Sequence, residues 1–185
     1  MFISEVENEQ DFDRKGSLIK KYAKKNFLPS QKEINVVEKY LSHEDYYLRE
    51  SATYALFFMW ELVEERLINK ALKILINENE DFDVRKWVFS GFPTIYKKIN
   101  DKRIPQYIYN VFRFSKDESV RKLCLKALLE IYGIDSKEIL LKEVENNIHF
   151  NKGTIEDRIE LFSKELLEIE QLLSDRTNTT PLPHE

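Results

Sequence analysis

The residues with the clearest capacity for chemistry are three pairs of aspartate and arginine that share one spacing. Each aspartate precedes its arginine by four residues, and the pairs are Asp45 with Arg49, Asp81 with Arg85, and Asp117 with Arg121. Such a pair could act in catalysis, or it could serve the fold as a helix cap and an ion pair. Because successive pairs are 36 residues apart, we interpret them as one repeated structural feature rather than as three catalytic sites.

The same interval of 36 residues aligns the sequence around the three pairs. Small residues follow each arginine by six positions (Ala55, Gly91, Ala127), and aromatic residues follow it by eleven (Trp60, Tyr96, Tyr132). Apolar residues recur one position before each arginine and three, six, seven and ten positions after it, which places them on one side of a helix. Apolar positions further upstream mark a second helix. Each unit is therefore a helix, a turn that carries the aspartate, and another helix.

These units predict an all-α domain of about nine helices over residues 1–174, because a single helix pair cannot bury its apolar face alone. The expected helices are 11–26, 31–42, 46–63, 65–77, 83–99, 102–115, 118–132, 136–148 and 154–174. We expect the core repeats to occupy 31–133 and residues 175–185 to form a flexible tail. Pro93 lacks a backbone N–H, so it should kink or split the helix 83–99.

The repeated aspartates and arginines have a predicted place in this arrangement. Each aspartate lies in a turn, where its carboxylate can accept backbone N–H bonds from the following helix. Each arginine could form a bidentate ion pair with the aspartate of its own or the adjacent unit. The six residues would then form a ladder of paired charges through the stack.

Other candidates for catalysis or metal binding are few. His43 and Glu44 form a pair in the first turn, but the equivalent turns carry Asn79-Glu80 and Ser115-Lys116, so a metal-ligand set is incomplete. The single cysteine, Cys124, excludes an intrachain disulfide and a cysteine zinc cluster. The sequence therefore predicts no metal, no cofactor and no catalytic site.

The composition favours a protein partner. The 185 residues carry a net charge of −4, and an acidic chain lacks the basic field that nonspecific nucleic-acid binding needs. The exception is the lysine-rich face of residues 20–25. The N-terminus has no apolar signal segment, and no apolar run approaches the roughly 20 residues of a membrane span. We therefore expect a cytoplasmic protein without a membrane partner.

The pattern Asp-x-x-[Val/Leu]-Arg, followed by small and apolar residues on a helix, resembles the HEAT-like repeat family. The resemblance covers residues 31–133 and implies a right-handed solenoid of helix pairs. It implies no single activity, since this fold carries scaffolds, enzymes and inhibitors. HEAT-like DNA glycosylases use Trp, Asp and Arg in their concave groove. Here Trp60 falls on the core face, whereas Trp87 has no core explanation.

In such solenoids the second helix of each pair usually lines the concave side. The residues predicted to bind a partner there are Glu50, Tyr54, Phe57, Glu61, Lys86, Trp87, Lys97, Lys122 and Lys126. This face begins acidic and aromatic and then becomes basic. Tyr54, Phe57 and the adjacent Phe58 have no core explanation on the helical wheel. They would be exposed interface anchors, unless the N-terminal helices cover them.

These observations predict a non-catalytic protein-binding module. A small acidic helical protein that acts alone is similar in size, charge and architecture to HEAT-like immunity proteins of bacterial toxin–immunity pairs, although no motif carries that likeness. The likeness implies a cognate toxin as partner, and a basic nuclease would suit an acidic inhibitor. A HEAT-like scaffold or regulatory adaptor and a HEAT-like DNA-repair glycosylase remain as alternatives.

Overall fold

The structure is a computed structural model that describes residues 2–132. These residues belong to the first of two compact units, Met1–Ser136. The expected helices 136–148 and 154–174 and the tail 175–185 lie outside the described residues, so the single domain over 1–174 stays a prediction.

The described residues form helices and no strand, which confirms the all-α prediction. The helices are α1 (Phe2–Asn8), α2 (Phe12–Lys25), α3 (Gln31–Glu38), α4 (Tyr46–Thr53), α5 (Glu65–Ile76), α6 (Phe82–Ile99), α7 (Arg103–Phe114) and α8 (Glu118–Tyr132). A 3-10 turn, η1 (Lys39–Ser42), continues α3, and a π-helical segment, η2 (Tyr54–Met59), continues α4. Each helix expected between residues 11 and 132 is present, whereas α1 was not predicted. None of the described helices has a stretch both long and apolar enough to cross a membrane.

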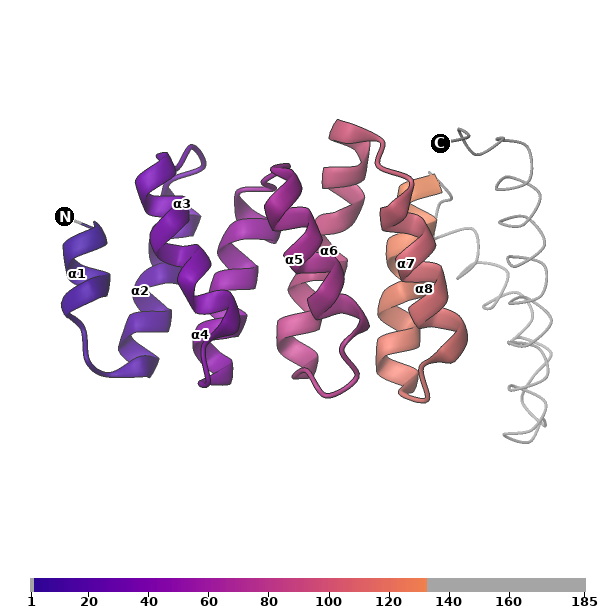
Figure 1. Cartoon of the computed structure of the whole chain (residues 1–185), viewed down its shortest axis with the longest axis horizontal. Coiled ribbons are helices and arrows are strands. Elements are labelled where there is room, and N and C mark those ends of the chain that lie inside the picture. Colours follow the sequence, from indigo (N-terminus) through magenta and orange to yellow (C-terminus); the bar gives the residue numbers. More distant parts are fainter. Residues whose placement is uncertain (1, 133–185) are drawn as a thin grey trace, which may run out of the picture. The chain divides into compact units, whose positions relative to one another are not determined.

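The helices are arranged in two layers (Figure 1). We call α2, α4, α6 and α8 the B layer, since they contain the second helix of each pair and pack side by side in chain order. The other layer contains α3, α5 and α7, of which α5 packs on α6 and α7 packs on α8. Each helix therefore buries one side against a partner in the other layer and its flanks against neighbours in its own.

The repeat alignment identifies the core correctly. The residues one position before the arginines, Leu48, Val84 and Val120, are all buried. The small residue six positions after each arginine marks a close approach of two helices. At Gly91 an added Cβ would lie 2.1 Å from the carbonyl oxygen of Phe57, so α6 and η2 meet backbone to backbone.

One predicted helix boundary is wrong, and of the two effects expected of Pro93, a kink or a split, the split is absent. The helix expected over 46–63 ends at Met59, because η2 closes with a bond from the Trp60 N–H to the Ala55 carbonyl at 2.9 Å and Glu61 then has a positive φ of 48°. The helix α6 runs unbroken through Pro93, so the proline does not split it. Proline inside a helix costs about 3 kcal/mol, and the buried side chains of α6 offset that cost.

Candidate partner-binding site

The repeated aspartates cap helices, as predicted. Asp45, Asp81 and Asp117 each accept a hydrogen bond from a backbone N–H two or three residues further on, at 2.8–2.9 Å. These N–H groups belong to the first turn of a helix and have no partner within it. The aspartate thus satisfies the start of α4, α6 or α8.

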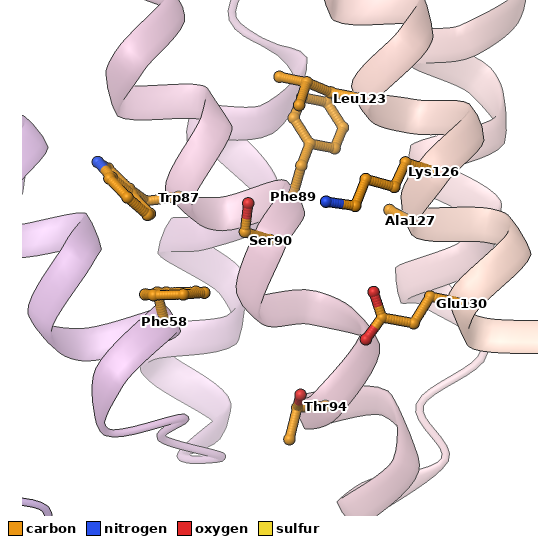
Figure 2. Close-up of a pocket in the computed structure, with 9 residues that line it drawn as sticks. All are labelled: Phe58, Trp87, Phe89, Ser90, Thr94, Leu123, Lys126, Ala127 and Glu130. Atoms are coloured by element: carbon orange, nitrogen blue, oxygen red, sulfur yellow. The ribbon is translucent and has the colours of Figure 1, made fainter. Parts of the chain in front are cut away.

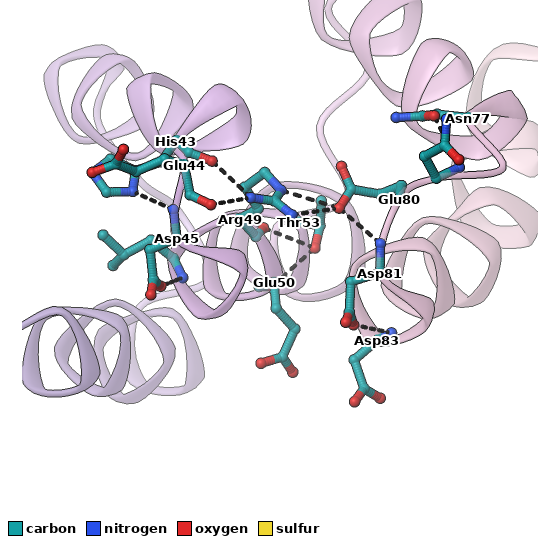
Figure 3. A network of polar contacts seen from close by, with 12 residues as sticks. His43, Glu44, Asp45, Arg49, Glu50, Thr53, Asn77, Glu80, Asp81 and Asp83 are labelled. Carbon is teal, nitrogen blue, oxygen red and sulfur yellow. Dashed lines mark hydrogen bonds and ion pairs between the residues drawn. The ribbon is translucent and has the colours of Figure 1, made fainter.

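The predicted ladder of Asp–Arg ion pairs is wrong for the described residues. Arg49 pairs with Glu80, whose Oε1 accepts bonds from Nε at 3.0 Å and Nη2 at 2.9 Å (Figure 3). The Arg49 Nη1 also donates to the backbone carbonyls of His43 and Glu44 at 2.8 and 2.7 Å. One guanidinium therefore ties its own turn to the turn of the next unit.

Arg85 shows the same preference for carbonyl groups. It is only 4% exposed, and its Nε and Nη2 donate to the Leu75 carbonyl at 3.2 and 2.9 Å. Leu75 lies at the end of α5, where helix carbonyls lack internal partners. Arg121 instead lies 5.4 Å from the ring centre of Phe112 on α7. The arginine therefore reaches back to the preceding helix, while the aspartate faces the following one.

Glu50, predicted to open the exposed face, is a buried connecting residue. Its Oε1 accepts the indole N–H of Trp87 at 2.8 Å, and its Oε2 pairs with Lys20 Nζ at 2.6 Å. The carboxylate on α4 therefore links α2 to α6 and is neutralised within the fold. It also fixes the orientation of the Trp87 ring.

Tyr54 and Phe57 are 6% and 0% exposed, so they are not exposed anchors. The alternative left open by the sequence agrees better with the structure, since α2 and α3 both pack against η2. Tyr54 packs edge-on against Trp87, with ring centres 4.7 Å apart. The wheel failed in all three units, because Pro93 of α6 and Leu129 of α8, which are equivalent to Phe57, are buried as well. It treats each helix alone and cannot show that neighbouring elements cover this side. Phe58 is the outward residue instead, and its ring is 37% exposed.

The side of the B layer that carries Phe58 presents a pocket of about 380 Å³ between η2, α6 and α8 (Figure 2). We call it the anchor pocket, and its lining residues are Phe58, Trp87, Phe89, Ser90, Thr94, Leu123, Lys126, Ala127 and Glu130. The rings of Phe58 and Trp87, 5.0 Å apart, form one wall. The Lys126 amine and the Glu130 carboxylate extend from α8 toward α6.

The structure separates the predicted binding residues into three groups. Trp87 and Lys126 line the anchor pocket, while Lys86 lies 4.8 Å from the Trp87 ring centre. Lys97 on α6 and Lys122 on α8 are exposed. The others do not join the pocket, since Glu50, Tyr54 and Phe57 are buried and Glu61 pairs with Lys98 at 2.7 Å.

Sequence reasoning noted Phe58 without including it among the predicted binding residues, and it missed Thr94 and Glu130. A signal for them was present, because these three residues stand nine positions after Arg49, Arg85 and Arg121 respectively. The wheel selected residues directly opposite the core. The pocket instead lies in the groove between neighbouring B-layer helices, so its lining comes from their flanks.

The exposed charges around the anchor pocket are mostly lysines. Lys86 and Lys122 each have a carboxylate of their own helix at 3.3 and 2.6 Å. No ion pair within the described part of the chain involves Lys24, Lys97 or Lys126. Among the described residues these three lysines and the Glu130 carboxylate are therefore without an ion pair, so positive charges outnumber the negative one.

Chemistry that needs a thiolate or a metal has little support in the described residues. Burial raises the pKa of the Cys124 thiol to about 12, so the nucleophilic thiolate is scarce at neutral pH. Between residues 2 and 132 no three His, Cys, Asp or Glu side chains are grouped so that they could hold a metal ion.

The two tryptophans serve the fold. Trp60 is buried and donates its indole N–H to the Asn26 carbonyl at 2.7 Å, and the Trp87 indole N–H is bound by Glu50. The site thus consists of a fixed aromatic wall, hydroxyl groups and charged residues around an apolar floor.

Compared with models of known protein families and with curated proteins, the chain matches none of them.

Proposed function

We propose that this chain is a non-catalytic protein-binding module that holds its partner at the anchor pocket. The observation that carries the proposal is the exposed Phe58 ring, which lies against a Trp87 ring that Glu50 fixes from behind. Rigid aromatic side chains beside a pocket are typical of the few residues that dominate binding energy at protein interfaces. No bound partner group is needed to hold this wall in place.

The proposal includes a finer description of the fold, namely a HEAT-like superhelix of helix pairs. The repeat of 36 residues and the side-by-side packing of α2, α4, α6 and α8 in chain order support it. In that arrangement the B layer lines the concave surface, and the anchor pocket lies within it.

A more specific form of the proposal is that the chain is a cytoplasmic immunity protein that neutralises a toxin. Its support is the likeness in size, charge and architecture noted above. The charge around the anchor pocket changes the expected partner, because unpaired lysines repel a basic nuclease at that surface. A toxin bound there would present an acidic surface instead.

The test is co-purification from native cells with the tagged full chain and two aromatic variants. Phe58→Ala removes the exposed ring of the pocket. Phe114→Ala is the matched control, because Phe114 is a 68% exposed phenylalanine on α7, in the other layer. We expect the wild type and the control to retain one stoichiometric protein, and the Phe58 variant to lose it. Equal retention by all three chains would contradict the proposed site.

A further inference from the structure

We infer that the part of the partner that enters the anchor pocket is an acidic segment with one apolar anchor side chain. The inference rests on the proposed protein-binding function and specifies the chemistry of the partner. It is carried by the shape and lining of the pocket and by the charges at its rim, which are separate observations.

The apolar anchor follows from the interior of the pocket. Phe89 and Ala127 are buried and form its floor together with Leu123, while Phe58 and Trp87 form a wall. A volume of about 380 Å³ is at the small end of the range for ligand sites. It therefore suits a single large side chain of a partner.

The acidic character follows from the rim. Lys126 lines the pocket, and Lys97 lies one helical turn beyond Thr94 on α6. Lys24 lies 5.9 Å from the centre of the Tyr54 ring, which packs on Trp87. These lysines have no carboxylate partner among the described residues, so carboxylates flanking the anchor would find charge-assisted bonds there.

The net charge of the whole chain has the opposite sign to the charge of residues 1–132. Residues 1–132 contain 23 Lys and Arg against 21 Asp and Glu, whereas residues 133–185 contain 6 against 12. The acidic balance of −4 thus comes from the sequence beyond residue 132. A partner chosen from the net charge alone would have the wrong sign for the anchor pocket.

A peptide fits the pocket better than a single-stranded nucleic acid. Glu130 lines the pocket and would repel a phosphate, and no arginine is among the lining residues. Ser90 and Thr94 offer hydroxyl groups to the backbone of a bound peptide.

The experiment is a selection of random displayed peptides on the immobilised full chain. We expect enrichment of peptides in which Asp or Glu residues flank one aromatic or aliphatic residue. A labelled consensus peptide should then lose affinity about tenfold for the double variant Lys97→Glu, Lys126→Glu, because two favourable charge contacts become repulsive. The loss should shrink at high salt, which screens exposed charges.

The control is a second double variant with the same change of charge, Lys73→Glu, Lys116→Glu. These lysines are exposed and lie on α5 and in the turn before α8, so the peptide affinity should stay near the wild-type value. Phe58→Ala should abolish peptide binding while the helical circular-dichroism spectrum of the folded chain is retained, which separates a loss of binding from a loss of fold.

Three results would overturn the inference: enriched peptides without acidic residues, no enrichment over the bare support, or equal losses in both double variants. A labelled oligothymidine that binds the wild type and not the Lys97, Lys126 variant would favour nucleic acid instead. The co-purification test separates the two proposals. If Phe58→Ala loses the co-purified protein but the selected peptides are not acidic, the protein-binding site stands and only the acidic segment is wrong. If Phe58→Ala retains the co-purified protein, the proposed binding site itself is wrong.

Discussion

At the scale of single residues, the recurring aspartate and arginine serve the two helix ends that meet at each turn. The aspartate accepts N–H bonds at the start of one helix. Arg85 donates to a carbonyl near the end of the helix before it, and Arg49 donates to carbonyls of the turn before its own helix. The sequence predicted the caps because an acceptor must precede a helix. It could not predict the carbonyl partners, because a guanidinium reaches many acceptors and spacing does not select among them.

The buried arginine should contribute more to stability than the exposed ones. We expect Arg85→Ala to lower the free energy of unfolding by about 1.5–3 kcal/mol, since it removes two bonds from a charged group to the Leu75 carbonyl. Urea unfolding followed by circular dichroism measures this loss. Arg113→Ala on the exposed side of α7 is the control and should change little. Equal effects of the two substitutions would show that the carbonyl contact is unimportant.

The helix cap can be tested with two substitutions at one position. Asp81→Ala should lower the free energy of unfolding by about 1 kcal/mol, because it leaves the Asp83 N–H unsatisfied. Asp81→Asn keeps an oxygen acceptor and should retain most of the stability. If the asparagine variant is as unstable as the alanine variant, the negative charge matters more than the cap.

At the scale of elements, the periodicity of apolar residues predicted where the helices lie, but it did not predict the π-helical segment η2. The bounds of α5, α6, α7 and α8 agree with the expected helices to within a residue or so. The segment η2 broke the pattern, because periodicity arguments assume α-helical geometry throughout. The burial of Phe57 has another cause, because the equivalent residues of the regular helices, Pro93 and Leu129, are buried as well. Periodicity within one helix does not show which neighbouring helices cover its outward side.

The close approach of α6 to η2 makes a prediction about Gly91. We expect Gly91→Ala to lower the free energy of unfolding by about 1–3 kcal/mol, since its Cβ would meet the Phe57 carbonyl at 2.1 Å. Differential scanning calorimetry of the variant would measure it. Ser90→Ala at the adjacent position adds no atom and should be nearly neutral. A stabilised Gly91→Ala variant would mean that helix propensity outweighs the clash.

At the scale of the whole molecule, the net charge and the charge around the proposed anchor pocket differ in sign. The mildly acidic chain predicted a basic partner, whereas the described residues carry unpaired lysines around an apolar pocket. Net charge averages over surfaces that face different directions, so it cannot assign a partner to one of them. The charge expected of a partner at the anchor pocket depends on the local charges there, such as Lys97 and Lys126.

The central claim is that a protein partner docks against Phe58. The most direct test replaces Phe58 with a photo-crosslinking phenylalanine analogue in the full chain, with the same analogue at Phe114 as the control. After irradiation in native cells we predict one protein crosslinked from position 58 and absent from position 114. Identical products at both positions, or no protein product at position 58, would contradict the account.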